Sequence, residues 1–372
     1  MAKKLRVGVV FGGRSSEHEV SVASARSVMA AMNSETYDII PIAIAKNGQW
    51  LPGTPPDALA SPKEMAASKP SEHIAAEPPE VFDRLPQLRD ATGQNRFPEV
   101  DIIFPVLHGA FGEDGTIQGM LELAGLPYVG CGILGSALGI DKEKAKILFR
   151  AAGIPVTPWV TCYRQEIRSA PEAIIRKVEA AFQYPVFVKP ATLGSSVGVT
   201  KAHNANELLE GLQMAAAYDR KILVEQGINC RELECAVLGN DNPAASVVGE
   251  VIASKEFYDY ESKYLDGASK TLVPAPIDNA LAQRIREYAI KAFQALDLSG
   301  LSRVDFFLSK DNGAIYLNEV NTLPGFTEIS MYPKLWEATG IPYTQLIDRL
   351  IELGFERARD RAAESYDAKL PN

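Results

Sequence analysis

Two segments in the last quarter of the chain carry polar side chains at alternate positions. Arg303 and Asp305 lie two residues apart in one predicted strand, and Glu319 and Asn321 lie two residues apart in the next. Side chains two positions apart share one face of a strand. The turn sequence at 310–313 favours a hairpin between the strands, which would gather these side chains into one patch. Carboxylate and amide oxygens are hard ligands that suit a Mg²⁺ ion bridging nucleotide phosphates.

The competing interpretation is an exposed hairpin in which polar residues merely alternate. Apolar residues interleave with the polar ones, which indicates one buried face and one face that carries the cluster. These apolar residues are Phe306, Phe307, Leu317 and Val320. We therefore predict a metal site on this hairpin.

The segment 187–199 predicts a phosphate-binding loop. Backbone N–H groups freed by Gly194 and Gly198 could cradle phosphate oxygens, and Lys189 at the end of a strand could add a positive charge. The segment is not a Walker A loop, because no Gly-Lys-Ser/Thr follows. From these residues alone, a flexible hairpin with a solvated lysine stays open.

Two further segments are candidates for ligand contacts. Residues 12–21 follow the first strand, where α/β proteins place ligand loops. Residues 256–265 combine four aromatic residues with charges, as a mobile lid would. Each could equally be a capped helix start or an ordinary loop, and His18 and His108 taken singly are typical of structural histidines.

Residues 130–135 match the Gly-x-Gly-x-x-Gly pattern after a possible strand at 126–129. A dinucleotide-binding fold needs an acidic residue about 20 positions later, at the end of a second strand. Residues 154–160 contain no carboxylate. A glycine-rich connection between domains is the better interpretation.

The first third of the chain alternates strand and helix patterns, which implies a mostly parallel sheet covered by helices. Asp114 is placed to cap one of these helices. Residues 52–86 hold eight of the 24 prolines and predict an irregular surface insertion. The predicted strands are 5–11, 37–45 and 101–108, and the predicted helices are 21–31 and the segment after Asp114.

From residue 141 onward, strands and helices are segregated, which indicates α+β domains. The predicted helices are 141–152, 171–182, 205–217 and 279–296. The predicted strands are 185–189, 197–202, 221–226, 232–239, 244–253, 301–309 and 314–321.

Composition is that of a globular protein. The 372 residues suggest two or three domains, with 46% apolar and 23% charged residues. The net charge of −9 argues against nucleic acid or an anionic membrane as a partner, since both need a basic face. No apolar stretch approaches the roughly 20 residues that span a bilayer. The four cysteines form no Cys-x-x-Cys pair, so we expect a reduced protein in the cytoplasm.

Five motifs, in order along the chain, resemble those of the D-alanine–D-alanine ligase family of the ATP-grasp superfamily. The motifs are residues 11–21, 107–109, 194–198, 257–264 and 318–325. The resemblance extends over the whole chain apart from the proline-rich insertion.

The resemblance implies three domains and a homodimer. An α/β domain with a parallel sheet would span 1–139, and a two-domain ATP-grasp fold would follow. Its central domain would span 140–224, and its C-terminal domain, with the lid loop and metal hairpin, would span 225–372. The implied reaction joins two D-alanine molecules at the expense of ATP, through an acyl phosphate, for peptidoglycan precursor synthesis.

The resemblance also assigns the nucleotide and metal contacts. Two Mg²⁺ ions, with Mn²⁺ as an alternative, would bind Asp305, Glu319 and Asn321. Lys142, Lys189 and Lys263 would hold the phosphates, and Glu225 with the backbone after it would meet the adenosine. The remaining ATP contacts would be Ser195, Ser196, Glu232, Asn318 and Glu319.

The contacts to D-alanine follow in the same way. Glu17 would bind the ammonium of the first D-alanine, and Ser195 and Tyr264 would link the lid to Glu17. Arg303 and the N–H of Gly325 would stabilise the oxyanion. His108, Ser330 and Met331 complete the implied substrate contacts, the last two at the carboxylate of the second D-alanine.

The chain departs from the family pattern at two places. Gln226 and Gly227 lie near the expected adenine, and residues 191–193 lead into the glycine-serine loop. Three alternatives stay open. A D-alanine–D-lactate ligase is the nearest, and a dinucleotide-dependent oxidoreductase and a non-catalytic amino-acid-binding protein are the others.

Overall fold

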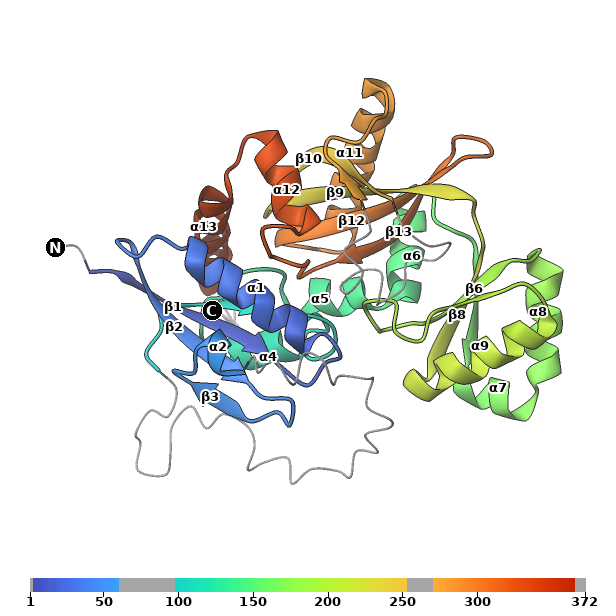
Figure 1. Cartoon of the computed structure of the whole chain (residues 1–372), viewed down its shortest axis with the longest axis horizontal. Helices are drawn as coiled ribbons and strands as arrows, with labels where there is room; N and C mark the ends of the chain where they lie inside the picture. Colours follow the sequence, from blue (N-terminus) through green and yellow to red (C-terminus); the bar gives the residue numbers. More distant parts are fainter. Residues whose placement is uncertain (1–2, 60–97, 253–269, 365–372) are drawn as a thin grey trace, which may run out of the picture.

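The computed structural model describes residues 3–59, 98–252 and 270–364, and the strands of these residues form three separate sheets (Figure 1). The segment 256–265, with Lys263 and Tyr264, lies outside the described residues, as does most of the proline-rich segment. None of the helices described is long and apolar enough to cross a membrane.

The N-terminal sheet has the order β3-β2-β1-β4. Its central strand, β1 (Leu5–Gly12), pairs in parallel with β2 (Tyr37–Ile44) and β4 (Ile102–Val106). Strand β3 (Trp50–Pro52) adds an antiparallel edge. The helices of this part are α1 (His18–Ala31), α2 (Pro56–Leu59) and α4 (Thr116–Leu123). The predicted α/β sheet is therefore confirmed.

The central sheet is antiparallel, in the order β5-β8-β6-β7. It has a hydrophobic core of its own beneath three helices, which lie together at the right of Figure 1. The strands are β5 (Trp159–Tyr163), β6 (Val186–Pro190), β7 (Thr200–Ala202) and β8 (Lys221–Gln226). The helices are α7 (Arg164–Ser169), α8 (Pro171–Ala181) and α9 (Ala205–Tyr218).

The C-terminal sheet is also antiparallel, in the order β11-β10-β9-β12-β13. Helix α11 (Asn279–Ala295) packs on one face, and α12 (Met331–Thr339) packs on β9 and β10. The last helix, α13 (Tyr343–Ala362), returns to α1 and β4, so the N- and C-terminal parts share one core. The strands are β9 (Cys230–Gly239), β10 (Ala244–Ile252), β11 (Lys270–Leu272), β12 (Gly300–Ser309) and β13 (Ile315–Asn321).

Two helices, α5 (Ile133–Ile140) and α6 (Lys142–Ala151), connect the N-terminal part to the central one. The Gly-x-Gly-x-x-Gly segment forms the start of α5, in agreement with its interpretation as a connection. A Cβ at Gly135 would lie 2.7 Å from the carbonyl oxygen of Asp297, so only glycine lets α5 approach this closely. The strand expected at 126–129 is reduced to a single bridge at Tyr128.

Other differences concern element boundaries, and eight of the described elements have no counterpart among the predicted helices and strands: β3, α2, α5, β5, α7, β11, α12 and α13. Helix α1 begins at His18, three residues before its predicted start. Asp114 accepts from the N–H of Thr116, but Gly115 occupies the N-cap of α4. Strand β7 begins three residues late, since Gly198, inside the predicted strand, has a φ of 70°, which an extended strand does not allow. The predicted domain boundary at 224/225 falls within β8, and the boundaries stay a prediction.

Candidate functional site

Three loops from different parts of the chain meet around the carboxylate of Glu17. Glu17 precedes α1 and is only 6% exposed. The hydroxyl of Ser195, in the loop after β6, donates to Glu17 Oε1. A Cβ at Gly109 or Gly194 would lie 2.7 or 3.0 Å from Glu17 Oε2, so both glycines leave room for this carboxylate. The predicted contact between Glu17 and Ser195 is therefore present.

The β12–β13 hairpin forms the second part of the site. Asp305 lies opposite Glu319, and Arg303 lies opposite Asn321, so the four side chains share a face as the alternation predicts. The register shifts by one residue between Asp305 and Phe306, which leaves Asn318 as the extra residue of a bulge. Because of the bulge, Asn318 and Glu319, although adjacent in sequence, both contact lysines of the site.

Arg303 is fixed between two carboxylates. Its guanidinium donates two hydrogen bonds of 2.7 Å to Asp305, and its Nε lies 3.0 Å from Glu234 Oε2. Burial lowers the pKa of Arg303, but Asp305 and Glu234 outweigh burial and raise it well above its usual value. The positive charge of Arg303 is therefore permanent and rigidly placed.

The hairpin offers a cation two carboxylates and one amide oxygen. Asn321 Nδ2 donates to Asp305 Oδ2 at 2.9 Å, so Asp305, Arg303 and Asn321 form one network. In the described residues no group of three or more His, Cys, Asp or Glu side chains could hold a metal ion. The donors suit Mg²⁺, which takes one or two protein carboxylates and completes its shell with phosphate and water oxygens.

Two lysines, one at the start of α6 and one on β6, contact this hairpin. Lys142 Nζ donates to the carbonyl of Leu193 at 2.7 Å and lies 3.4 Å from Glu319. Lys189 Nζ donates to Asn318 Oδ1 at 3.2 Å. The site thus lies where the central and C-terminal parts face each other.

Helix α6 is anchored so that Lys142, its first residue, is held in place. Asp141 caps the helix by accepting from the N–H of Lys144, and it also accepts from Lys221 Nζ of β8 at 2.7 Å. These bonds join the helix start to the central sheet, while Ala145 and Phe149 of the same helix pack in the core of the C-terminal sheet.

Beneath Lys189 lies a buried charge network. Glu225 accepts from Lys189 at 2.8 Å and lies 3.1 Å from Lys146 Nζ. Burial raises the pKa of Glu225, but the two lysines outweigh it and hold the pKa below its usual value. The Glu225 side chain, expected at the adenosine, is thus directed at the two lysines.

The segment after β13 carries the other predicted substrate contacts. Ser330 Oγ accepts from the N–H of Thr327 at 3.0 Å, and a Cβ at Gly325 would lie 3.2 Å from the same oxygen. Met331 begins α12 and buries its side chain in the core. Gly325 and Ser330 are therefore neighbours in space.

His108 and Glu113, both from the N-terminal part of the chain, contact the segment that follows β13. His108 is 4% exposed, and its ring nitrogens lie 2.8 Å from the carbonyl of Leu323 and 3.2 Å from Ser24 Oγ. Glu113 lies beside it and accepts from the N–H groups of Gly109 and Leu323.

The predicted residues Ser196 and Glu232 lie at the edges of this arrangement. Ser196 follows Ser195 in the loop and shares its positive φ. Glu232 lies on β9, where its charge contributes to raising the pKa of Lys189.

Sequence reasoning missed Lys146, Glu113 and Ser24. Lys146 follows Lys142 by four residues, so the two lie on one face of α6, and that spacing could have revealed it. Glu113 follows the carboxyl end of β4, where the ligand loops of α/β sheets lie. Ser24, inside α1, gave no signal.

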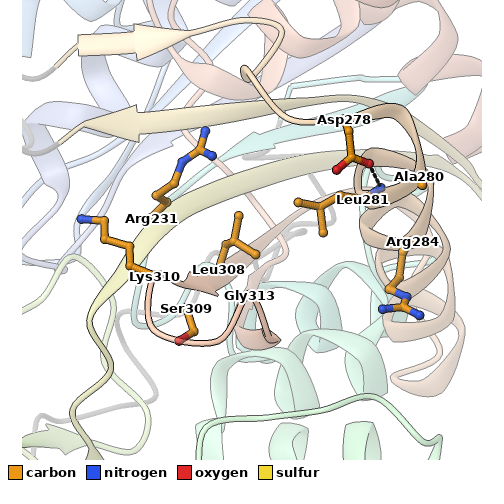
Figure 2. Close-up of a pocket in the computed structure, with 9 residues that line it drawn as sticks. All are labelled: Arg231, Asp278, Ala280, Leu281, Arg284, Leu308, Ser309, Lys310 and Gly313. Carbon is orange, nitrogen blue, oxygen red and sulfur yellow. Dashed lines mark hydrogen bonds between the residues drawn. The ribbon is translucent and has the colours of Figure 1, made fainter.

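A separate cavity of about 640 Å³ lies between the start of α11 and the β12–β13 turn (Figure 2). In its lining, Asp278 accepts from the N–H of Leu281, and Arg231 pairs with Glu250. No predicted site residue is part of its lining in the described chain.

Comparison with known proteins reveals matches over nearly the whole chain. The family model "D-ala D-ala ligase N-terminus" matches residues 6–131, and "D-ala D-ala ligase C-terminus" matches residues 148–352. The D-alanine–D-alanine ligase of Acetivibrio thermocellus is 51% identical, over 99% of this chain and 100% of that protein. The same-named protein of Ruminiclostridium cellulolyticum is also 51% identical, over 98% of each chain.

Solved structures agree with these matches. The VanG D-Ala:D-Ser ligase of Enterococcus faecalis has a TM-score of 0.79 at 39% identity, over 95% of this chain and all of that one. The D-alanine–D-alanine ligase of Coxiella burnetii has a TM-score of 0.78 at 35% identity, over 96% and 97%. The predicted ATP-grasp fold is thereby confirmed.

Proposed function

Because the chain belongs to the D-alanine–D-alanine ligase family, we propose that it joins two D-alanine molecules to D-alanyl-D-alanine and converts ATP to ADP and phosphate. The observation that carries the proposal is the meeting of three groups at one place. These are the Glu17–Ser195 pair, the two lysines that face the hairpin, and the Arg303–Asp305–Glu319 cluster.

The first step activates a poor electrophile. A carboxylate oxygen of the first D-alanine attacks the γ-phosphorus of ATP, ADP leaves, and an acyl phosphate forms. Lys142 and Lys189 bind the phosphate oxygens, and both lie within 3.4 Å of hairpin side chains, so the phosphates enter between the two sheets. Mg²⁺ bound with Asp305, Glu319 and Asn321 would neutralise charge on the transferring group.

Glu17 orients the first D-alanine. Its carboxylate binds the substrate ammonium and is held in place by Ser195. With the ammonium fixed, only one enantiomer presents both its carboxylate to the phosphates and its methyl group to the remaining space.

In the second step, the amine of the second D-alanine attacks the acyl carbon and expels phosphate. Negative charge develops on the carbonyl oxygen, and Arg303 with the Gly325 N–H stabilises it. Ser330, together with the N–H groups at the start of α12, binds the carboxylate of the second D-alanine.

The alternative product, an ester with D-lactate, is not favoured, since the relatives are named for D-alanine. The neighbour named D-Ala:D-Ser ligase makes D-serine the competitor to test.

The test supplies ATP, Mg²⁺ and D-alanine and identifies both products by mass spectrometry. ADP and D-alanyl-D-alanine in equal amounts support the proposal, whereas AMP would indicate adenylation and contradict it. Parallel reactions with equimolar D-serine or D-lactate measure the choice of second substrate.

We further propose a homodimer in the cytoplasm, where ATP is available. Apolar side chains on α4 and α5 support the dimer, since Leu123 is 94% exposed and Leu134 is 56% exposed. Sedimentation velocity of the protein tests this, with a monomer at micromolar concentration as the contrary result.

A further inference from the structure

The peptide of Leu323 is bound on both sides by the N-terminal part of the chain. Its N–H donates to Glu113 Oε1 at 2.9 Å, and its carbonyl lies 2.8 Å from His108 Nδ1. Both side chains are buried, with 7% and 4% exposure. Buried bonds of this kind are costly to break, because the freed groups have no water to replace the lost partner.

The bonds of His108 fix where its proton lies. A carbonyl can only accept, so Nδ1 carries the hydrogen. Burial lowers the pKa of His108, which favours the neutral ring. Nε2 is then an acceptor for the hydroxyl of Ser24, 3.2 Å away.

Ser24 completes the hold on the same segment. Its Oγ, having donated to His108, accepts from the N–H of Phe326 at 3.3 Å. On the C-terminal side, the hydroxyl of Tyr343 donates to the carbonyl of Phe326 at 2.6 Å. Hydrogen bonds therefore hold the chain on both sides of Gly325.

The two oxygens of the Glu113 carboxyl each accept a backbone hydrogen bond; burial raises the pKa of Glu113 to about 7, and these two bonds oppose the rise by favouring the ionised form. The second oxygen of Glu113 accepts from the N–H of Gly109 at 2.8 Å, so the group accepts two backbone hydrogen bonds from distant loops. Gly109 in turn lies against Glu17. A glutamine could accept only one of the two bonds, and its amide group would face the other N–H.

We propose that Glu113, His108 and Ser24 form a clamp that sets the position of the Gly325 N–H and thereby acts in the second step of the reaction. The three are positioning residues, since they act through the 323–326 segment. The inference rests on the proposed function, in which Gly325 faces the oxyanion. His108, expected from the sequence to bind substrate, instead has both ring nitrogens engaged by the clamp.

The reaction offers a readout that separates the two steps. Phosphoryl transfer forms no tetrahedral oxyanion, whereas attack by the second amine does. Reversible transfer is followed by positional isotope exchange in ATP labelled with ¹⁸O at the β–γ bridge, and the second step by dipeptide release. The ratio of exchange to dipeptide measures how much of the acyl phosphate reverts to ATP and how much goes on to dipeptide.

For Glu113→Gln, we expect dipeptide turnover to fall about 10- to 100-fold, since loss of an oxyanion donor costs about 10²–10³ and a displaced donor costs less. The KM for ATP should stay within about twofold, since in the described chain Glu113 forms no hydrogen bond or ion pair with a proposed nucleotide residue. The exchange-to-dipeptide ratio should rise about tenfold or more. Ser24→Ala, which removes a single oxygen and with it both hydrogen bonds of Ser24, should raise it about threefold and guards against a Glu113 variant that does not fold.

The matched control is Glu122→Gln. Glu122 on α4 accepts from the hydroxyl of Tyr128 and pairs with Arg361 of α13, so it also joins the N- and C-terminal parts, away from Gly325. Its exchange-to-dipeptide ratio should equal that of the parent.

A parent-like ratio in both Glu113→Gln and Ser24→Ala would overturn the clamp, as would a rise of equal size in Glu122→Gln. If the parent protein makes no dipeptide at all, the proposed function fails, and that result is read before any variant is compared.

Discussion

Three carboxylates of the site, Glu17, Asp305 and Glu319, have different partners, and the partner determines the chemistry of each. Glu17 accepts from the neutral hydroxyl of Ser195, so its negative charge is available to a cationic substrate group. Asp305 shares its charge with Arg303 in a bidentate pair. Glu319 lies 3.4 Å from Lys142, one of the two lysines proposed to bind phosphate.

Glu17→Gln should raise the KM for D-alanine at the first site by about tenfold or more, because an amide cannot neutralise the substrate ammonium. ATP binding should change less than twofold, since the proposed nucleotide contacts lie on the central and C-terminal sheets. Calorimetric titration with nucleotide in the absence of D-alanine measures the second quantity. A large loss of ATP affinity would contradict the assignment.

Glu319→Gln should lower kcat at least 100-fold while the protein stays folded, because one of two cation-binding carboxylates is lost. Turnover measured over a Mg²⁺ titration, with a thermal melt as the folding check, tests this. The control is Glu352→Gln on α13, an exposed residue paired only with Arg349 in the described contacts. Near-parent turnover of the Glu319 variant at ordinary Mg²⁺ would show that the metal assignment is wrong.

On the scale of the elements, two local features shape the fold around the site. One is the bulge on β13, and the other is glycine where two segments of backbone lie close together. The bulge lets Asn318 and Glu319 both serve the site, which a regular strand would forbid. Helix α5 approaches the loop after α11 at Gly135, where no side chain fits.

Two helical glycines give opposite predictions for the same substitution. Gly119→Ala on α4 should raise the free energy of unfolding by about 0.5–1 kcal/mol, since the nearest atom to a Cβ, Ile133 Cδ1, is 3.9 Å away. Gly135→Ala on α5 should lower it by about 1–3 kcal/mol, because the Cβ would clash with the backbone of Asp297. Urea unfolding of both variants measures these changes, and equal effects would refute the packing argument.

On the scale of the whole molecule, the three sheets differ in whether they share a hydrophobic core with another sheet. The N- and C-terminal sheets share a core that includes Phe104, Leu238 and Leu350, whereas the central sheet has its own core. Polar contacts join the central part to the rest at the site: Ser195 to Glu17, and Lys189 to Asn318. A ligand that binds between these groups therefore stabilises the assembly of the central part with the rest of the chain.

Mg²⁺ with ATP should accordingly raise the melting temperature by several degrees. A ligand at 100 times its Kd stabilises the folded state by about 2.7 kcal/mol, and each kcal/mol moves the melting temperature of a large domain by about 2–4 °C. Lys189→Met should abolish most of the shift, and Lys310→Met, on the exposed hairpin turn, should retain it. Scanning calorimetry with and without a chelator measures the shifts, and a full shift in the Lys189 variant would exclude its phosphate role.

The sequence by itself determined most of the elements up to residue 321 and the members of the hairpin cluster, but it predicted neither α12 nor α13. Period-2 alternation placed Arg303 with Asp305 and Glu319 with Asn321, because side-chain direction in a strand is a local property. Helix and strand patterns located most elements to within three residues for the same reason. The ordered motifs were enough to identify the family.

Only the tertiary structure decided which distant groups meet. Nothing in the local sequence around Glu113 shows that its carboxylate accepts from Leu323, 210 positions away. Lys146 is one lysine of a lysine-rich helix until the fold buries it against Glu225. Side chains become buried and paired with other groups when separate elements pack together. Burial and pairing then set the charge and the position of the groups in the site.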